Sequence, residues 1–173
     1  MNKIIGWVAI LSILWIVVAE VYEKPVETEA QTFAKIGAEA PGFTLQTLHG
    51  KSYSLGQAQG KPLVINFWNA WCHPCRKETP ELIKLYKQYK GKFQLYGVNV
   101  TADDSLGAVK LFVEHFHIPY PVLLDKSGSV SNHYKITGRP VTYFINAKGI
   151  IVGKITGYQP QKLRKKIKTL VSQ

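Results

Sequence analysis

Cys72 and Cys75 are the only two cysteines in the 173-residue sequence, and just two residues, His73 and Pro74, separate them. Two thiols at this spacing can close into a small disulfide ring and reopen by exchange with another thiol. A ring of four residues restricts the unfolded chain very little, so the pair makes a poor structural crosslink. The spacing therefore predicts a redox-active disulfide between Cys72 and Cys75.

The elements on either side of the cysteines favour the same chemistry. An apolar strand pattern covers Leu63–Trp68, and a helical pattern follows from Arg76 to Tyr89. A cysteine that opens a helix has its thiolate stabilised by unpaired N–H groups and by the helix dipole. We expect Cys72 to attack the disulfide of a partner and Cys75, one turn later, to release that partner. The oxidised pair then needs a separate thiol donor.

Three neighbours could tune this site. A protonated His73 would stabilise the Cys72 thiolate and make the disulfide more oxidising, and a solvated histidine without influence is the alternative. Pro74 suits the first helical turn, where its missing N–H costs little. Trp71 is predicted to lie on an exposed apolar rim around Cys72, with packing in the core as the alternative.

The rest of the chain alternates strand and helix patterns. We expect a hairpin from 43–45 and 53–55, strands at 93–100, 121–124, 141–145 and 150–155, helices at 105–116 and 130–134, and a final helix with Leu163, Ile167 and Leu170 on its apolar face. This order predicts one α/β domain over residues 36–173.

Four blocks of this domain resemble the membrane-tethered TlpA/ResA-type thiol-disulfide oxidoreductases. They are the active-site block 66–80, the start 40–45, the segment 138–145 and the segment 120–125. The resemblance covers about residues 36–171. It implies a thioredoxin-like fold with an N-terminal β-hairpin and a central strand-helix insert, and no cofactor.

The resemblance also implies roles for further residues. Members of the family carry a glutamate at the position of Glu78 that influences the cysteine pKa values and handles protons, although an ordinary surface glutamate is the alternative. Asn66 occupies the strand position at which thioredoxin itself has a buried aspartate. Pro140 matches a proline that is cis throughout the superfamily and lies opposite the cysteines. The backbone of Arg139 would pair there with a substrate, and its charge suggests an acidic partner.

The implied activity is reduction of specific protein disulfides, such as those of apocytochrome c or of envelope or spore proteins, by a monomer that a membrane thiol donor re-reduces. Two alternatives remain open. A copper-delivery protein of the same fold would bind metal through both cysteines and a distant histidine. A thiol peroxidase would want a threonine where this chain has Asn69.

The N-terminus predicts a membrane anchor over residues 1–22. The sixteen residues Ile4–Ala19 carry no charge, and as a helix they would span about 24 Å of a hydrocarbon core of about 30 Å. Lys3 before the run and Glu20 after it favour a cytoplasmic N-terminus and a domain outside the cytoplasm. Cleavage after a signal peptide, at Val17–Ala19, is the alternative, as is a buried core helix. Residues 23–35 read as a polar tether.

The sequence is strongly basic, with 22 Lys and Arg against 11 Asp and Glu and a net charge of +11. Solubility or an anionic cell-surface setting would explain this. Nucleic-acid binding is disfavoured because no basic stretch is interleaved with aromatic residues at a recognisable spacing. The lysines of the final helix are interpreted as a solvated face, with contact to anionic lipid as the alternative. His115 and His117 do not have the spacing of metal ligands on a helix, so no metal site is expected.

Overall fold

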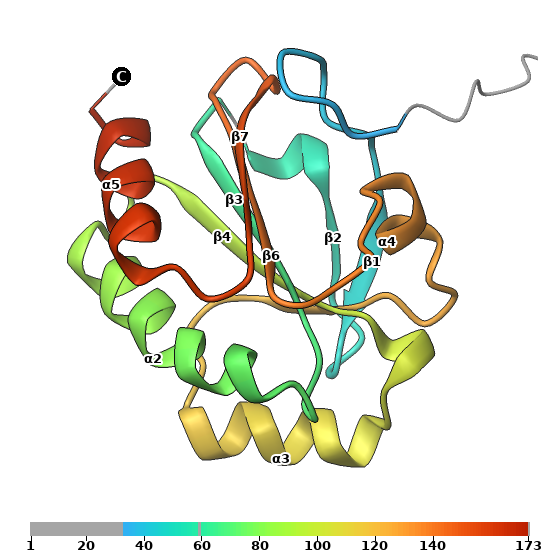
Figure 1. Cartoon of the computed structure of the whole chain (residues 1–173). Coiled ribbons are helices and arrows are strands. Elements are labelled where there is room, and N and C mark those ends of the chain that lie inside the picture. Colours follow the sequence, from blue (N-terminus) through green and yellow to red (C-terminus); the bar gives the residue numbers. More distant parts are fainter. Residues whose placement is uncertain (1–32, 59, 173) are drawn as a thin grey trace, which may run out of the picture. The chain divides into compact units, whose positions relative to one another are not determined.

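A computed structural model describes residues 33–58 and 60–172 of the chain (Figure 1). They form a seven-stranded sheet in the order β2-β1-β5-β4-β3-β6-β7. The strands are β1 (Thr44–Thr47), β2 (Ser52–Ser54), β3 (Leu63–Trp68), β4 (Gln94–Asn99), β5 (Val122–Leu124), β6 (Val141–Ile145) and β7 (Ile151–Thr156). The helices are η1 (Leu55–Ala58), α2 (His73–Gln88), η2 (Thr101–Asp103), α3 (Leu106–Phe116), α4 (Ser129–His133) and α5 (Pro160–Leu170).

The predicted anchor, residues 1–22, and most of the predicted tether lie outside the described residues. In the part of the chain that the structure describes, none of the helices combines the length and the apolar character needed to cross a bilayer.

The centre of the sheet is parallel and its margins are antiparallel. Strand β3 pairs in parallel with β4, and β4 with β5, whereas β6 runs antiparallel to β3. All six residues of β3 are buried, which explains why the strand reads as an almost continuous apolar run rather than as an alternation. The hairpin of β1 and β2 is antiparallel and joins the sheet through β5. This agrees with the predicted N-terminal hairpin.

Helices cover both faces of the sheet. On one face, Val64 packs in a cluster with Leu82 of α2 and with Leu163 and Ile167 of α5. Its neighbour Ile65 points to the other face and packs in a cluster that includes Val130 of α4 and Tyr134, the residue after this helix. This alternation along β3 follows from the period of two in a strand. Asn66 and Trp68 therefore lie on the same face as α2.

The predicted elements agree with the structure to within a few residues. β3 and β6 have the predicted limits. Helix α2 begins at His73, three residues before the predicted start at Arg76, because Cys72 caps it and its Sγ accepts a hydrogen bond from the backbone N–H of Cys75 at 3.2 Å. Pro74 consequently lies in the first turn, as expected.

Candidate redox site

Cys72 and Cys75 lie just after the end of β3, near the middle of the sheet, and form a disulfide with an Sγ–Sγ distance of 2.03 Å. Cys72 is the N-cap of α2, and Cys75 is in its first turn. The strand fixes the position of the loop, and at the start of the helix the backbone N–H of Cys75 donates a hydrogen bond to the first sulfur. The structure thus gives Cys72 the local environment that stabilises a thiolate.

The disulfide is sheltered from solvent. Cys72 is 3% exposed and Cys75 1% exposed. Both belong to an apolar cluster that includes Trp68 of β3 and Phe112 of α3. His73, between the two cysteines, is exposed. The residues around the sulfurs, rather than the sulfurs themselves, are therefore the part of the site that is exposed to solvent.

Glu78 of α2 is buried against the face of the sheet that carries Asn66. It is only 1% exposed, so it is not a surface carboxylate. Its Oε2 accepts a hydrogen bond of 2.8 Å from Nδ2 of Asn66, and that nitrogen also donates to Oγ1 of Thr142 at 2.9 Å. The Oε1 atom is buried and has no hydrogen-bond partner among the described residues.

Burial raises the pKa of Glu78 from 4.5 to about 7, and the hydrogen bond from Asn66 opposes this shift only in part. A carboxyl group with such a pKa exchanges its proton readily at neutral pH. Glu78 follows Cys75 by three residues, a spacing that places both on one side of a helix. The arrangement can therefore move a proton next to the second cysteine.

The loop before β6 lies beside the cysteine loop, because Val141 of β6 is paired with Phe67 of β3. The peptide bond between Arg139 and Pro140 is cis, as the resemblance implied. The guanidinium of Arg139 forms an ion pair of 2.6 Å with Asp103, and the Arg139 side chain is only 14% exposed. The charge of Arg139, which suggested an acidic substrate, is thus already paired with Asp103 of the same chain.

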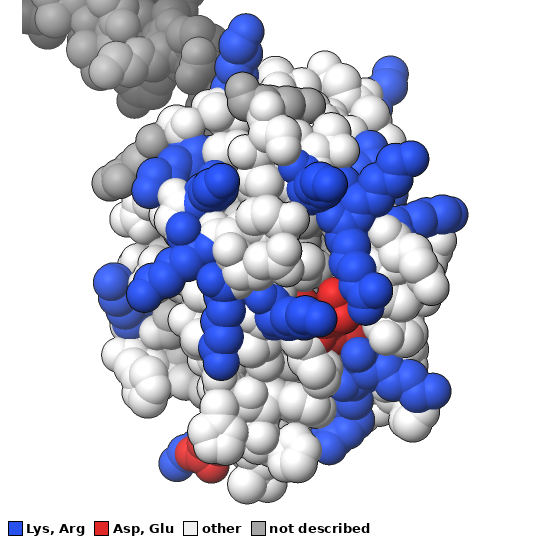
Figure 2. Space-filling view, turned by 90° about the vertical axis from the view of Figure 1, so that its left-hand side faces the viewer, with Lys and Arg blue, Asp and Glu red and all other residues white. Residues whose placement is uncertain are grey.

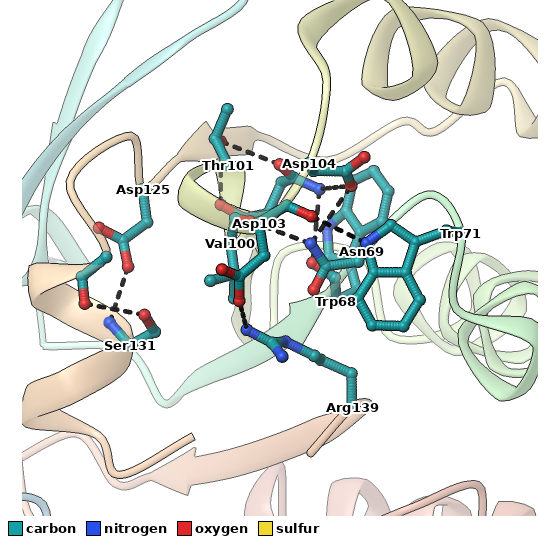
Figure 3. A network of polar contacts seen from close by, with 12 residues as sticks. Trp68, Asn69, Trp71, Val100, Thr101, Asp103, Asp104, Asp125, Ser131 and Arg139 are labelled. Carbon is teal, nitrogen blue, oxygen red and sulfur yellow. Dashed lines mark hydrogen bonds and ion pairs between the residues drawn. The ribbon is translucent and has the colours of Figure 1, made fainter. Parts of the chain in front are cut away.

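Trp71 stands on the surface next to the disulfide. It is 62% exposed, which favours the predicted apolar rim over packing in the core. Its Nε1 donates to the backbone carbonyl of Asp103 at 2.9 Å, and the guanidinium of Arg139 lies 6.0 Å from its ring (Figure 3). Asp103 therefore joins the rim to the loop that carries Pro140.

Asp104 organises a polar network below this rim (Figure 3). Its Oδ2 accepts hydrogen bonds from the backbone N–H of Ala70 at 2.6 Å, from Asn99 at 2.9 Å and from Asn69 at 3.3 Å. Its Oδ1 accepts from the backbone N–H of Ser105 at 2.9 Å. One carboxylate thereby ties the loop before Cys72 to the end of β4 and the start of α3.

Sequence reasoning missed this network, although one signal pointed to it. Asp103 and Asp104 follow β4 closely, and Asn69 follows β3 directly. β3 and β4 are parallel neighbours, so their carboxyl ends meet at one edge of the sheet. Polar residues at both ends could have been expected to meet there.

Asn69 is part of that framework. It is fully buried, and its Nδ2 donates to the carbonyl of Val100 at 2.9 Å as well as to Asp104. The position at which a thiol peroxidase would want a threonine is thus occupied here by a side chain that holds two loops together.

An apolar depression lies beside the disulfide. It is lined by Ala70, Trp71, Arg76, Ala108, Leu111, Phe112 and His115. Leu111 is 68% exposed, and Arg76 lies over the ring of Phe112 at 5.5 Å. One wall of the depression therefore comes from α3.

In residues 33–58 and 60–172, no three His, Cys, Asp or Glu side chains are grouped so that they could hold a metal ion.

A Cys-x-x-Cys disulfide at the start of a helix, next to a cis proline on a thioredoxin-like sheet, defines a class of protein: the thiol-disulfide oxidoreductases of the thioredoxin superfamily. Comparison with known proteins agrees. Residues 36–154 match the AhpC/TSA family, and the chain belongs to that family.

The chain is similar to several known proteins, and some of their names state a thiol-disulfide activity. The chain is 40% identical over 116 residues to the thioredoxin-like protein YneN of Bacillus subtilis, covering 66% of this chain and 68% of the relative. It is 37% identical over 131 residues to the thiol-disulfide oxidoreductase ResA of Bacillus cereus, covering 74% of this chain and 73% of ResA. A crystal structure of a putative thiol:disulfide interchange protein DsbE from Chlorobium tepidum superposes with a TM-score of 0.73 at 26% identity, covering 79% and 98% of the two chains.

The protein is therefore a thiol-disulfide oxidoreductase that works by dithiol-disulfide exchange at its Cys-x-x-Cys pair.

Proposed function

We propose that this oxidoreductase reduces disulfides of protein partners outside the cytoplasm, with Cys72 as nucleophile, Cys75 as resolving thiol and Glu78 as the group that takes the proton of Cys75. The observation that carries the proposal is the buried Glu78 carboxyl group, which follows Cys75 by one helical turn and has a pKa of about 7.

The reaction balances in two exchanges. The Cys72 thiolate attacks one sulfur of the partner's disulfide, a mixed disulfide forms, and the other partner sulfur leaves as a thiolate that takes a proton. Cys75 then loses its proton to Glu78 and attacks Sγ of Cys72. The mixed disulfide breaks, and the second partner sulfur leaves as a thiolate that takes up a proton while Glu78 releases the one it received. The partner then carries two thiols, and Cys72 and Cys75 are oxidised. A thiol donor at the membrane must return two electrons to the pair.

Glu78 is suited to the second exchange because Cys75 is buried. A thiol that is 1% exposed cannot easily give its proton to bulk water. The carboxylate accepts a hydrogen bond from Asn66, which fixes its orientation, and its second oxygen has no other partner among the described residues. That oxygen is the atom that would receive the proton.

Burial of the sulfurs supports the reductive direction. A thiolate loses stability when it is removed from water, so the apolar surroundings of both sulfurs oppose the stabilisation that the start of α2 gives to the Cys72 thiolate. Cysteine pairs that act as strong oxidants have the opposite property, a stabilised reduced form. Cys72 and Cys75 pack against Trp68 and Phe112, and this favours a low reduction potential.

The depression between Trp71 and Leu111 supports a polypeptide as partner. Its apolar walls offer side chains of a partner a place to bury surface next to the disulfide. Substrates that the resemblance suggests are the haem-binding cysteines of apocytochrome c and proteins of the envelope or spore.

The apolar run at the N-terminus supports a site of action outside the cytoplasm. Residues 1–22 would anchor the chain as a single span with the N-terminus in the cytoplasm, and residues 23–35 would tether the monomeric domain on the other side.

A trapping experiment tests the proposal. In Cys75→Ser, the mixed disulfide on Cys72 cannot be resolved, so covalent adducts with partner proteins should accumulate and disappear on treatment with dithiothreitol. The matched variant Cys72→Ser should form none. Adducts of equal abundance in both variants, or in neither, would show that the assigned roles are wrong.

A further inference from the structure

Six lysines form a basic face on the domain, away from the cysteines. Lys84 comes from α2, Lys154 from β7, and Lys162, Lys165, Lys166 and Lys168 from α5. They line two neighbouring depressions that share Lys165, and all six are exposed. Figure 2 shows this side of the molecule with lysines and arginines spread across it.

Little negative charge balances this basic face. Among the described residues that line the two depressions, Glu81 is the only acid. Both of its oxygens accept hydrogen bonds from Arg164, at 2.7 and 2.9 Å, so the pair is neutral together. Among the described residues, none of the six lysines forms an ion pair with an acid.

The arrangement costs the helix stability. Leu163, Ile167 and Leu170 face the core, and the basic residues fill the outward face. Lys162 and Lys166 are four residues apart, and like charges at this spacing destabilise a helix. A helix face that only meets water normally mixes charges of both signs. A negatively charged partner would remove the repulsion.

From these observations we propose that the basic face docks on the anionic headgroups of the membrane to which the chain is anchored. This inference depends on the proposed anchor, and it does not depend on the proposed thiol chemistry.

Two features favour a lipid surface as the partner. The charged amines of lysines lie at the ends of flexible side chains, and here six of them are spread over three elements. They can therefore adjust to headgroups that move in the bilayer. A specific protein interface would want large apolar anchors at its centre. The large exposed apolar side chains of residues 33–58 and 60–172 are Phe33, Ile36, Trp71, Leu106, Leu111 and Tyr158, and none of them lines these depressions.

The chain can reach this position. Residues 20–32, between the apolar run and the start of the described domain, span at most about 45 Å when extended. A domain of this size has a radius of gyration of about 14 Å, so the tether is long enough to bring any face of it to the bilayer. Lys84 follows Cys72 by twelve residues, about 18 Å along α2, so docking leaves the disulfide accessible to partners.

Lysine footprinting of the full chain tests the proposal. The chain is placed in nanodiscs of phosphatidylcholine alone or of phosphatidylcholine with phosphatidylglycerol, and acetylation by an N-hydroxysuccinimide ester is followed by mass spectrometry. We expect Lys165, Lys166 and Lys168 to react about fivefold more slowly in the anionic discs, the factor that corresponds to one lysine held at an anionic surface. The protection should vanish in 1 M salt, where the screening length is about 3 Å.

Internal controls and charge variants sharpen the result. Lys51 and Lys126, near the opposite edge of the sheet, should react at the same rate in both discs. The variant K165E/K166E/K168E should lose the protection of Lys162, whereas K51E/K126E should keep it, and both should retain disulfide reduction in solution. Equal rates in both discs would overturn the proposal. So would protection that persists without anionic lipid, which would indicate the glutamates of residues 20–32 or another acidic protein segment as the occupant.

Discussion

Glu78 shows how the environment of one residue sets its chemistry. The carboxyl group is buried on the face of the sheet that packs against α2, and desolvation outweighs the single hydrogen bond from Asn66. An aspartate in place of Asn66 would add a second carboxyl group, but asparagine can only orient the first. Of these two side chains, only Glu78 can bind and release a proton.

Replacement of Glu78 with glutamine should change how stability depends on pH. The folded chain holds the Glu78 proton up to about pH 7, whereas the unfolded chain releases it near 4.5. Stability that depends on this proton is complete below pH 4.5, falls as the pH rises to 7 and then levels off. Between pH 4.5 and 7, the free energy of unfolding of the native chain should therefore fall by on the order of 3 kcal/mol relative to that of Glu78→Gln. Denaturant unfolding of both proteins between pH 4 and 8 measures it, and parallel curves would contradict the assignment.

The same substitution should separate the two exchange steps. Formation of the mixed disulfide needs the Cys72 thiolate, and its resolution needs the proton of Cys75 to leave. In Glu78→Gln, resolution should therefore slow more than formation in stopped-flow experiments with a disulfide peptide. If both steps slowed equally, Glu78 would not be the proton acceptor for Cys75.

His73 makes a prediction about the reduction potential. The residue is exposed at the start of α2, between the two cysteines. A positive imidazole there would stabilise the reduced thiolate form, so His73→Ala should lower the potential, measured against glutathione or dithiothreitol mixtures. An unchanged or raised potential would show that the histidine does not act on the thiolate.

At the scale of elements, the site depends on loops at the carboxyl edge of the parallel strands. The ends of β3 and β4 meet there, and Asp104 accepts hydrogen bonds from both. The loop that carries Asp103 also contacts Trp71 and Arg139. The position of the cysteine loop is thus set in part by the loop after β4, which is distant from it in the sequence.

Replacement of Asp104 with alanine should destabilise the fold. The backbone N–H of Ala70 and the amides of Asn69 and Asn99 would lose a charged acceptor, and loss of a hydrogen bond to a charged group costs about 1.5–3 kcal/mol. We expect the free energy of unfolding to fall by about 2–3 kcal/mol. Glu114→Ala, which removes an exposed pair with Lys110, is the matched control and should change it by less than about 1 kcal/mol. Equal effects would argue against a central role for Asp104.

At the scale of the whole molecule, apolar packing and charge are distributed over different surfaces. The disulfide and the apolar depression lie at the start of α2, whereas the basic face covers α5 and the second half of α2. Partner recognition and contact with a membrane therefore do not compete for one surface.

The reduction potential of the whole chain shows whether the protein reduces or oxidises its partners. Because the sulfurs are buried in an apolar cluster, we expect a value near that of thioredoxin, about −270 mV. A value near −120 mV would instead indicate an oxidant of the DsbA kind and would contradict the proposed reduction of partners.

Much of this could be predicted from the sequence because the signals are local. The limits of β3 and β6 follow from short apolar runs. Helix α2 begins three residues before the start that the helical pattern predicts, because Cys72 caps it. The cis bond before Pro140 was expected from the resemblance alone, since most bonds of this kind are trans.

The sequence by itself determined that two cysteines lie one helical turn apart at the start of a helix, because that spacing depends only on neighbouring residues. Only the tertiary structure decided that Asn66 contacts both Glu78 and Thr142, and that Asp103 pairs with Arg139. Such contacts join residues as many as 76 positions apart, and they depend on which strands pair and in which register. The depth to which Glu78 is buried, and hence its pKa, has the same origin.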